Sequence, residues 1–257
     1  MDIFIVSLVA LLASGLTLFS GFGLGTLLMP VVALFFPLEV AIGVTAIVHL
    51  ANNLFKVALL GRHTEWSVFW RFGGPAMVAA LLGAWVLGWL AAGEASLSYN
   101  LLGYSLQTTA LRLIVGGLIL IFVLLEFSRW FAALALHRRY LPLGGMISGF
   151  FGGLSGHQGA FRSMFLIKAG LTKEQFVATG VMVAVVVDVS RLLVYGKHLS
   201  ASYQQIEWSL VVAACLSAFL GAWLGRRLLQ KVTLKAVHLM VSVLLGVVAL
   251  GLMAGLI

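Results

Sequence analysis

Apolar residues fill most of the chain and fall in long segments separated by short polar stretches. Runs of about 18 or more apolar residues with few charges are typical of helices that cross a membrane. The pattern therefore predicts an all-α polytopic membrane protein. The apolar segments cover approximately residues 3–36, 40–60, 72–92, 110–128, 141–168, 174–195, 205–228 and 236–257.

The composition agrees with a protein surrounded by lipid. Of the 257 residues, 62% are apolar and 9% are charged, against about 45–50% and about 25% in soluble domains. This excludes soluble enzymes, nucleic-acid-binding proteins and disulfide-rich secreted domains, because a soluble fold of this length cannot bury so much apolar surface. Cys215 is the single cysteine and no metal-binding motif is present, so we expect no cofactor and no metal site. Asp2, in place of a basic region, indicates mature membrane structure rather than a cleaved signal peptide.

The second half of the chain repeats the first half weakly but in a consistent order. We interpret residues 1–128 as a first transmembrane repeat, 129–140 as a basic cytoplasmic loop and 141–257 as a second repeat. Internal repeats of this kind are more typical of transporters than of enzymes. The matches are Gly21 with Gly156, Glu39 with Glu174, Asn53 with Asp188, Lys56 with Arg191, and Gly61–His63 with Gly196–His198 at an offset of 135, and Gly83–Trp85 with Gly221–Trp223 at an offset of 138.

The first apolar segment of each half is too long for a simple span. As helices, residues 2–36 and 141–169 would measure roughly 52 Å and roughly 43 Å, whereas the hydrocarbon core is about 30 Å thick. Glycine clusters interrupt both segments, at 21–25 and at 152–159. Each segment is therefore either a kinked single span or a re-entrant hairpin with its tip near the middle of the membrane.

The distribution of positive charge favours the hairpins. If all eight segments cross the membrane, six Lys and Arg residues lie on one side and seven on the other. If the first segment of each half turns back, eleven lie on one side and only Arg112 and Lys197 on the other. The excess of Lys and Arg in cytoplasmic loops supports the second arrangement. It predicts six full spans, two hairpins, both termini in the periplasm, and two halves of opposite orientation, which is an inverted repeat.

The two glycine-rich breaks are the first candidate for a transport site. Non-helical backbone at membrane depth occurs where it lines a cavity or is buried in protein. The half-helices that follow the breaks would direct N–H groups at an anion. The alternative is that the glycines only permit close helix packing, as Gly145, Gly149 and Gly153 also could.

Polar residues beside the breaks supply candidate ligands. Arg162 lies in an otherwise apolar arm, and its planar guanidinium suits an oxyanion, with structural pairing as the alternative. His157 and Gln158 could instead satisfy neighbouring backbone groups. The other candidates are Ser155, Gly156, Gly159 and Ser163 at the second break, and Gly23, Gly25 and Thr26 at the first.

The middle helix of each half carries a further polar set. His49, Asn53 and Lys56 lie in the first half, and Asp188 and Arg191 in the second. The spacing of three residues places Asn53 with Lys56, and Asp188 with Arg191, on one helix face. Lys56 and Arg191 could instead extend to the membrane interface, and a salt bridge to Arg191 would neutralise Asp188.

One motif suggests an enzyme. Gly153-Leu154-Ser155-Gly156 resembles the serine motif of rhomboid intramembrane proteases. That chemistry needs a histidine base at hydrogen-bond distance on a neighbouring helix. On the later helices, the downstream histidines His198 and His238 fall in a predicted loop and near the end of a span. Proteolysis through Ser155 is therefore a remote alternative.

The segments Gly21–Pro30 and Phe150–Leu171 resemble the TauE/SafE family of sulfite-exporter-like permeases, and the resemblance extends over essentially the whole chain. It implies export of sulfite, sulfoacetate or a related small sulfur oxyanion across the bacterial inner membrane. The family's glycine-rich stretches correspond to Gly21, Gly23, Gly25, Gly152, Gly153, Gly156 and Gly159. Where many members have consecutive glycines, this chain has Phe22 and Leu24.

We therefore expect a secondary transporter whose partners are a small inorganic or organosulfur anion and the lipid bilayer. The oligomeric state is open, with a homodimer as one option. A permease for another small ion, including a metal cation, is the alternative. Against a cation, Asp188 is the only carboxylate that lies clearly within a span.

A monoanion leaving a negative-inside cell gains about 2.3 kcal/mol per 100 mV. Since the spans show only Asp188 and an isolated His49, we expect electrogenic uniport without a proton relay.

Overall fold

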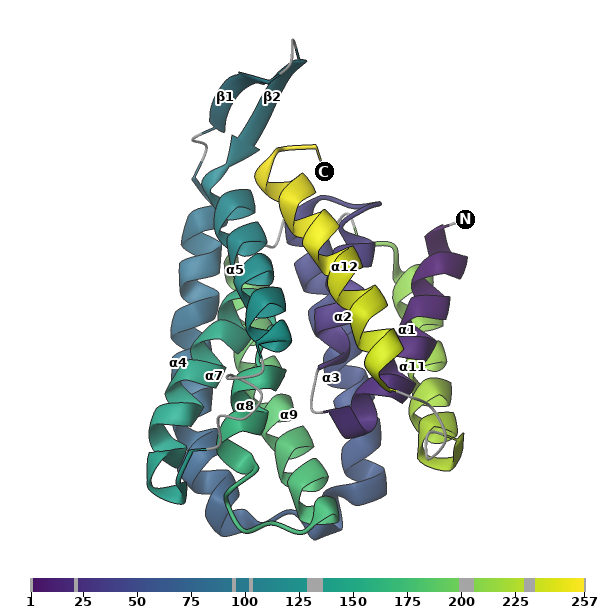
Figure 1. Ribbon diagram of the computed structural model, residues 1–257, viewed down its shortest axis with the longest axis vertical. Helices are drawn as coiled ribbons and strands as arrows, with labels where there is room; N and C mark the ends of the chain where they lie inside the picture. The colour runs from purple at the N-terminus through teal and green to yellow at the C-terminus, as the bar shows by residue number, and fades with distance from the viewer. Residues whose placement is uncertain are drawn as a thin grey trace.

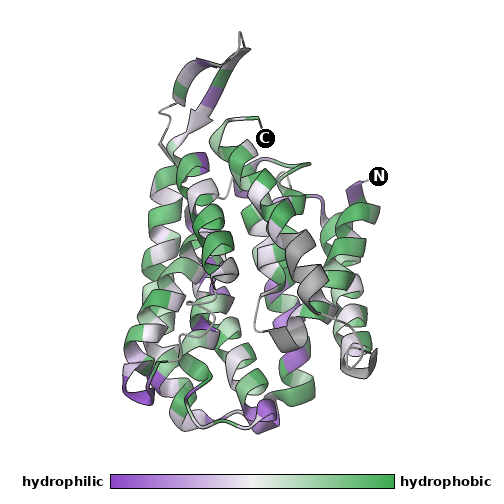
Figure 2. Cartoon of the chain, in the orientation of Figure 1, coloured by the Kyte–Doolittle hydropathy of each residue, from purple (hydrophilic) through white to green (hydrophobic). Residues whose placement is uncertain are grey.

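The computed structural model describes residues 2–20, 23–93, 96–101, 104–128, 136–198, 206–228 and 234–256. Within these residues the protein is a bundle of helices with one β-hairpin that projects from one end (Figure 1). Figure 2 shows that the helices are apolar over most of their length and that hydrophilic residues gather at one end and inside the bundle. The predicted all-α membrane fold is confirmed.

The elements of the first half begin with a broken helix. They are α1 (Asp2–Ser20), α2 (Leu24–Val32), α3 (Leu38–Leu60), the 3-10 helix η1 (Gly61–His63), α4 (Trp66–Ala91), strands β1 (Ser96–Leu101) and β2 (Tyr104–Thr109), and α5 (Ala110–Phe127). The strands pair antiparallel, with Ser96 opposite Thr109 and Leu101 opposite Tyr104.

The second half also begins with a broken helix. Its elements are the 3-10 helix η2 (Arg138–Tyr140), α7 (Leu141–Ser155), α8 (Gly159–Leu166), α9 (Lys173–His198), α11 (Trp208–Leu228) and α12 (Leu234–Met253). Most of the segment predicted as a basic loop, residues 129–140, lies outside the described residues, which resume at 136. The division into two repeats stays a prediction.

Both broken helices turn back on themselves. Gly23 precedes α2 with extended backbone (φ −80°, ψ 145°). Gly156 ends α7 in the left-handed region (φ 82°), where residues with a Cβ atom are disfavoured. The amide of Leu136, before α7, donates to the carbonyl of Met164 in α8, so α8 returns to the end where α7 begins. The α1–α2 hairpin enters from the opposite end of the bundle (Figure 1). The re-entrant form is therefore correct, and the kinked span is not.

Four described helices, α3, α4, α9 and α11, are long and apolar enough to cross a membrane by length and composition. The helices α5 and α12 have 18 and 20 residues, which corresponds to roughly 27 and 30 Å. On α4, Trp66 and Trp70 are exposed near one end, and Trp85 and Trp89 near the other. The midpoints of these pairs are roughly 28 Å apart along the helix. Tryptophan is enriched at both membrane interfaces, and this spacing fits the thickness of a bilayer.

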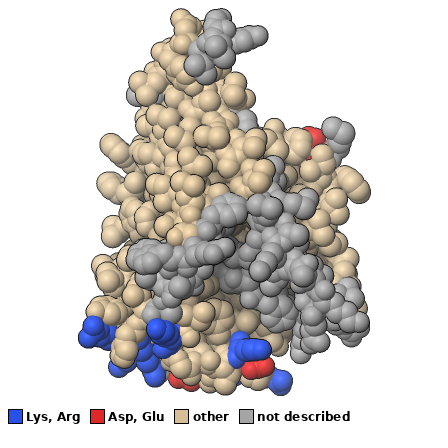
Figure 3. Space-filling view, in the orientation of Figure 1, with Lys and Arg blue, Asp and Glu red and all other residues tan. Residues whose placement is uncertain are grey.

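Basic side chains gather at one end of the molecule (Figure 3). At this end the segment after η1 contacts α9, since the amide of Glu65 donates to Thr179, and η2 contacts the start of α4, since Arg138 donates to Ser67. The exposed cations at this end include Arg62, Arg138, Arg139, Lys168 and Lys173. Both termini lie at the opposite end (Figure 1), as the hairpin interpretation requires.

Each hairpin packs against a helix from the other half of the chain. A Cβ atom on Gly145, Gly149 or Gly153 of α7 would lie 2.1 Å from a backbone carbonyl oxygen of α4. The close-packing interpretation of these three glycines is therefore correct. On the other side of the bundle, a Cβ atom on Gly221 of α11 would likewise lie 2.1 Å from the carbonyl oxygen of Leu11 in α1.

These contacts bear on the predicted repeat. Gly83 of α4 and its repeat match Gly221 of α11 each pack on a hairpin, at the carbonyls of Phe150 and Leu11 respectively. Equivalent contacts at matched positions are what an internal repeat predicts. The inverted symmetry of the two halves itself stays a prediction.

The hairpins give a first test, by cysteine accessibility in a Cys215→Ser background. Single cysteines at Pro37 and Lys173 should react from opposite sides of the membrane, because each position follows a hairpin that enters from a different end. Eight plain spans would place both positions on the same side. Labelling of both cysteines by an impermeant reagent from one side alone would therefore contradict the fold.

The glycine contacts give a second test. Gly149→Ala should destabilise the protein by about 1–3 kcal/mol, because the new methyl group meets the backbone of Ala76, which cannot move without shifting α4. This corresponds to a melting temperature lower by several degrees. Gly74→Ala is the matched control, since nothing lies within 4 Å of a Cβ atom there. Equal melting temperatures for the two variants in detergent would show that the α4–α7 contact is not this tight.

Candidate functional site

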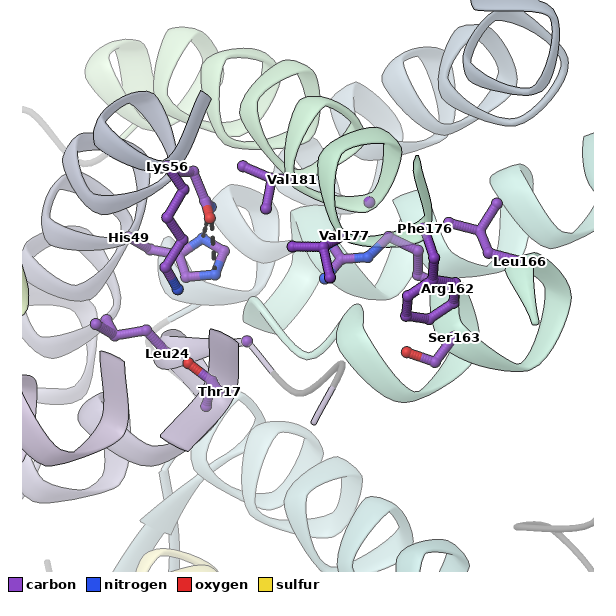
Figure 4. A pocket seen from close by; sticks show the side chains of 13 residues that line it. Thr17, Leu24, His49, Lys56, Arg162, Ser163, Leu166, Phe176, Val177 and Val181 are labelled. Carbon is purple, nitrogen blue, oxygen red and sulfur yellow. Dashed lines mark hydrogen bonds between the residues drawn. The ribbon is translucent and has the colours of Figure 1, made fainter. Parts of the chain in front are cut away.

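A pocket lies inside the bundle where the first hairpin, α3, α8 and α9 meet (Figure 4). Its volume is about 460 Å³, its open mouth included. The described lining residues are Thr17, Gly23, Leu24, His49, Asn53, Lys56, Arg162, Ser163, Leu166, Phe176, Val177, Gly180 and Val181. Six of them are candidate site residues from the sequence: Gly23, His49, Asn53, Lys56, Arg162 and Ser163.

Helix α3 supplies one wall of the pocket. His49, Asn53 and Lys56 are four and three residues apart, so they lie on one face of the helix. All three are buried, and the side chain of Lys56 is 4% exposed. Extension of Lys56 to the membrane interface is therefore wrong. Lys56 therefore places an ammonium group inside the protein.

Arg162 of α8 reaches toward His49 and Lys56 from the opposite wall (Figure 4). The residue is buried, and its Nη1 has no hydrogen-bond partner among the described residues. Gly180 of α9 lies beneath the side chain, since a Cβ atom there would be 3.4 Å from Nε of Arg162. The structural pairing considered for Arg162 is not found in the described part of the chain, and the guanidinium faces the pocket.

Behind the pocket, Asp188 of α9 connects the two middle helices. His49 Nδ1 donates to Asp188 Oδ2 over 2.6 Å, and Asn53 Nδ2 donates to the same oxygen over 3.0 Å. Arg191 Nη2 lies 2.7 Å from Asp188 Oδ1, so the two side chains form an ion pair. The Asp188–Arg191 salt bridge, considered from the sequence as an alternative to a role in transport, is present, and Arg191 does not extend to the interface.

This network also contacts both hairpin tips. A Cβ atom on Gly23, in the first tip, would lie 3.0 Å from His49 Nε2. A Cβ atom on Gly156, in the second tip, would lie 2.7 Å from a terminal nitrogen of Arg191. Each hairpin tip therefore contacts a side chain, His49 or Arg191, that is itself bonded to Asp188.

The charges around the pocket do not balance. Asp188 is the only buried carboxylate among the described residues, and Arg191 pairs with it. Lys56 and Arg162 remain, two buried cations that face one space without a described carboxylate of their own. Buried charges are costly unless paired, so this space favours an anion. No group of three or more His, Cys, Asp or Glu side chains that could hold a metal ion exists among the described residues.

The tip of the second hairpin lies apart from the pocket lining. His157 stacks on Phe122 of α5, with ring centroids 5.4 Å apart, and Ser148 donates to the carbonyl of Gln158. The side-chain amide of Gln158 and Nε2 of His157 are buried without a described partner. Gly25 and Thr26 in α2, and Gly159 at the start of α8, also fall outside the lining.

Ser155 and His157 do meet, which bears on the protease alternative. His157 Nδ1 lies 3.2 Å from Ser155 Oγ but 3.0 Å from the carbonyl oxygen of Ser155. The hydroxyl of Ser155 donates to the carbonyl of Phe151. A ring nitrogen that donates to a carbonyl cannot also accept the serine proton, and no described group orients His157 from behind. This geometry does not activate Ser155 as a nucleophile.

Sequence reasoning did not find most of the apolar wall. Thr17, Phe176, Val177 and Val181 look like ordinary membrane-facing positions, and only the fold brings them to the pocket. Gly180 carried a weak signal, a lone glycine within an apolar helix. Of the two half-helix N-termini expected at the site, that of α2 lines it through Gly23 and Leu24, whereas that of α8 does not. Gly21 lies outside the described residues.

The expectation that His49 is isolated is wrong. His49 and Asp188 are 139 positions apart in the sequence but share a hydrogen bond. The premise of uniport, that the spans hold no connected acidic and imidazole groups, therefore fails.

The comparisons with known proteins agree with a membrane transporter. Residues 6–252, nearly the whole chain, match the family model described as Sulfite exporter TauE/SafE. No curated protein and no solved structure matches the chain. The family match covers the hairpins, the middle helices and every described residue of the pocket lining. The chain therefore belongs to the sulfite exporter TauE/SafE family of membrane transporters.

Proposed function

We propose that the protein exports a small sulfur oxyanion, such as sulfite or an organosulfonate, through the pocket between the two hairpins. The observation that carries the proposal is the uncompensated pair Lys56 and Arg162, which face one buried space. The family supports a transporter of sulfite or a similar anion.

The chemistry of the wall suits an oxyanion. A guanidinium presents several N–H donors in one plane, which matches two oxygens of a tetrahedral or pyramidal anion. Nη1 of Arg162 is buried without a described partner and is thus available to such a ligand. The N-terminus of α2 at Gly23 and Leu24 adds backbone N–H groups and the positive end of a helix dipole. Asn53 and Ser163 add neutral polar groups.

The same charges argue against a cation as substrate. A metal or organic cation entering the pocket would meet Lys56 and Arg162 first, and the carboxylate of Asp188 is already engaged by His49 and Arg191. Another small anion is the second candidate, because the same donors would bind it.

The orientation follows from the basic end of the molecule. Because Lys and Arg are enriched in cytoplasmic loops, we place the end with η1 and η2 in the cytoplasm of a bacterial cell and both termini in the periplasm. The membrane potential, negative inside, then favours outward movement of an anion. This supports export as the direction.

Sulfite flux in proteoliposomes tests the proposal. Arg162→Gln and Lys56→Gln should each reduce flux by about tenfold or more, since each removes a charged hydrogen-bond donor of about 1.5–3 kcal/mol. Arg162→Lys should be impaired as well, because an ammonium lacks the planar fork.

Arg139→Gln is the control, since it removes an exposed cation outside the pocket and should leave flux unchanged. Sulfite should also raise the melting temperature of the wild type more than that of Arg162→Gln. Wild-type flux in Arg162→Gln and Lys56→Gln, with both proteins folded, would remove the pocket as the anion site.

A further inference from the structure

We propose that His49 is a proton-binding site coupled to the anion site, so that the protein carries a proton together with its anion. The inference rests on the proposed function, because the coupled ligand is the anion held by Lys56 and Arg162. It replaces the expectation of simple uniport.

The hydrogen bonds of His49 define which nitrogen can take up the proton. Nδ1 lies 2.6 Å from Asp188 Oδ2, and a carboxylate only accepts, so Nδ1 is the donor in this pair. In the neutral ring Nε2 is therefore the unprotonated nitrogen. It lies on the side of Gly23 in the first hairpin tip, and its described hydrogen-bond contact is the amide of Asn53 at 3.5 Å, the outer limit for such a bond.

The position of the ring makes the site accessible from the pocket. All three residues are almost fully buried, but His49 belongs to the pocket lining, whereas Asp188 and Arg191 lie behind it. A proton can reach Nε2 along the path that the anion uses. The carboxylate of Asp188 then stabilises the imidazolium directly across the 2.6 Å hydrogen bond.

The charged groups around His49 link the proton to the anion. Lys56 on the same helix, Arg162 on α8 and Arg191 on α9 all disfavour a further positive charge, and Asp188 alone favours it. The first hairpin contributes no titratable side chain, because none occurs between Asp2 and Glu39. In the empty pocket the cations therefore oppose protonation. An anion between Lys56 and Arg162 offsets their charge and favours the imidazolium, and by reciprocity a proton on His49 strengthens anion binding.

The coupling changes what crosses the membrane. A divalent oxyanion that moves with the proton of His49 carries one net negative charge instead of two. Transport then responds to the pH gradient as well as to the membrane potential. His157 does not serve this purpose, because it stacks on Phe122 outside the pocket lining.

Calorimetry of sulfite binding to the purified protein tests the inference. At alkaline pH, where sulfite is a dianion, titrations in buffers of different ionisation enthalpy give the number of protons taken up per anion bound. The wild type should take up about one proton, and His49→Gln, which keeps a donor for Asp188, should take up almost none. His63→Gln, at the exposed basic end, is the matched control and should behave as the wild type.

The outcomes separate this inference from the proposed function. A wild type that binds no sulfite contradicts the proposed function itself. Binding without proton uptake, or uptake retained in His49→Gln, overturns only the proton site.

A second measurement covers the case in which His49→Gln does not bind sulfite or does not fold. In wild-type protein labelled with ¹⁵N-histidine, sulfite should convert the Nε2 signal of His49 from the imine to the imidazolium range. The signal is assigned by substituting the other five histidines one at a time. An Nε2 signal that stays in the imine range with sulfite bound overturns the inference.

Discussion

The buried carboxylate of Asp188 is the group on which the centre of the molecule depends. A lone carboxylate at this depth would be strongly destabilising, and His49, Asn53 and Arg191 compensate it from two helices of different halves. The same contacts place His49 beside the first hairpin tip and Arg191 beside the second. Asp188 neutralises the charge of Arg191. It is therefore not available to neutralise Lys56 and Arg162, whose positive charges face the pocket. Removing one partner of such a buried pair typically costs about 3–5 kcal/mol.

The sequence was sufficient to predict the helical membrane fold and its two hairpins, because lipid imposes simple rules on the length and charge of each segment. The segments 2–36 and 141–169 are longer than the bilayer is thick, and the Lys and Arg residues gather on one side only when both segments turn back. The fold agrees on both points. The spacing of Gly145, Gly149 and Gly153 suggested close helix packing, but only the structure shows that the helix they contact is α4. Sequence spacing tells which residues share a helix face, but not which helix that face meets.

The same limit explains the outcome at the site. Arg162, His49 and Lys56 were recognisable, because charged or polar side chains within apolar segments are rare. Val177, Gly180 and Val181 were not, because apolar residues of a pocket wall and of a lipid-facing surface have the same composition. The His49–Asp188 hydrogen bond joins the middle helices of the two halves, and nothing local in either helix reveals it. His157 and Gln158 were expected at the pocket because they are polar residues at the second glycine-rich break, but they lie outside its lining, just after the turn at Gly156.

Each hairpin packs on a helix from the other half of the chain, and this has a consequence for biosynthesis. The hairpin of α1 and α2 is made first, yet the helix on which α1 packs, α11, begins only at Trp208. At about 5–20 residues per second, the chain needs roughly 10–40 s to reach it. During that time Gly15 and the carbonyl of Leu11, which later meet Gly225 and Gly221, have no partner helix to cover them. The second hairpin has no such delay, because α4 is in place before α7 is made. Of the two hairpins, the N-terminal one is therefore the one whose packing depends on completion of the chain.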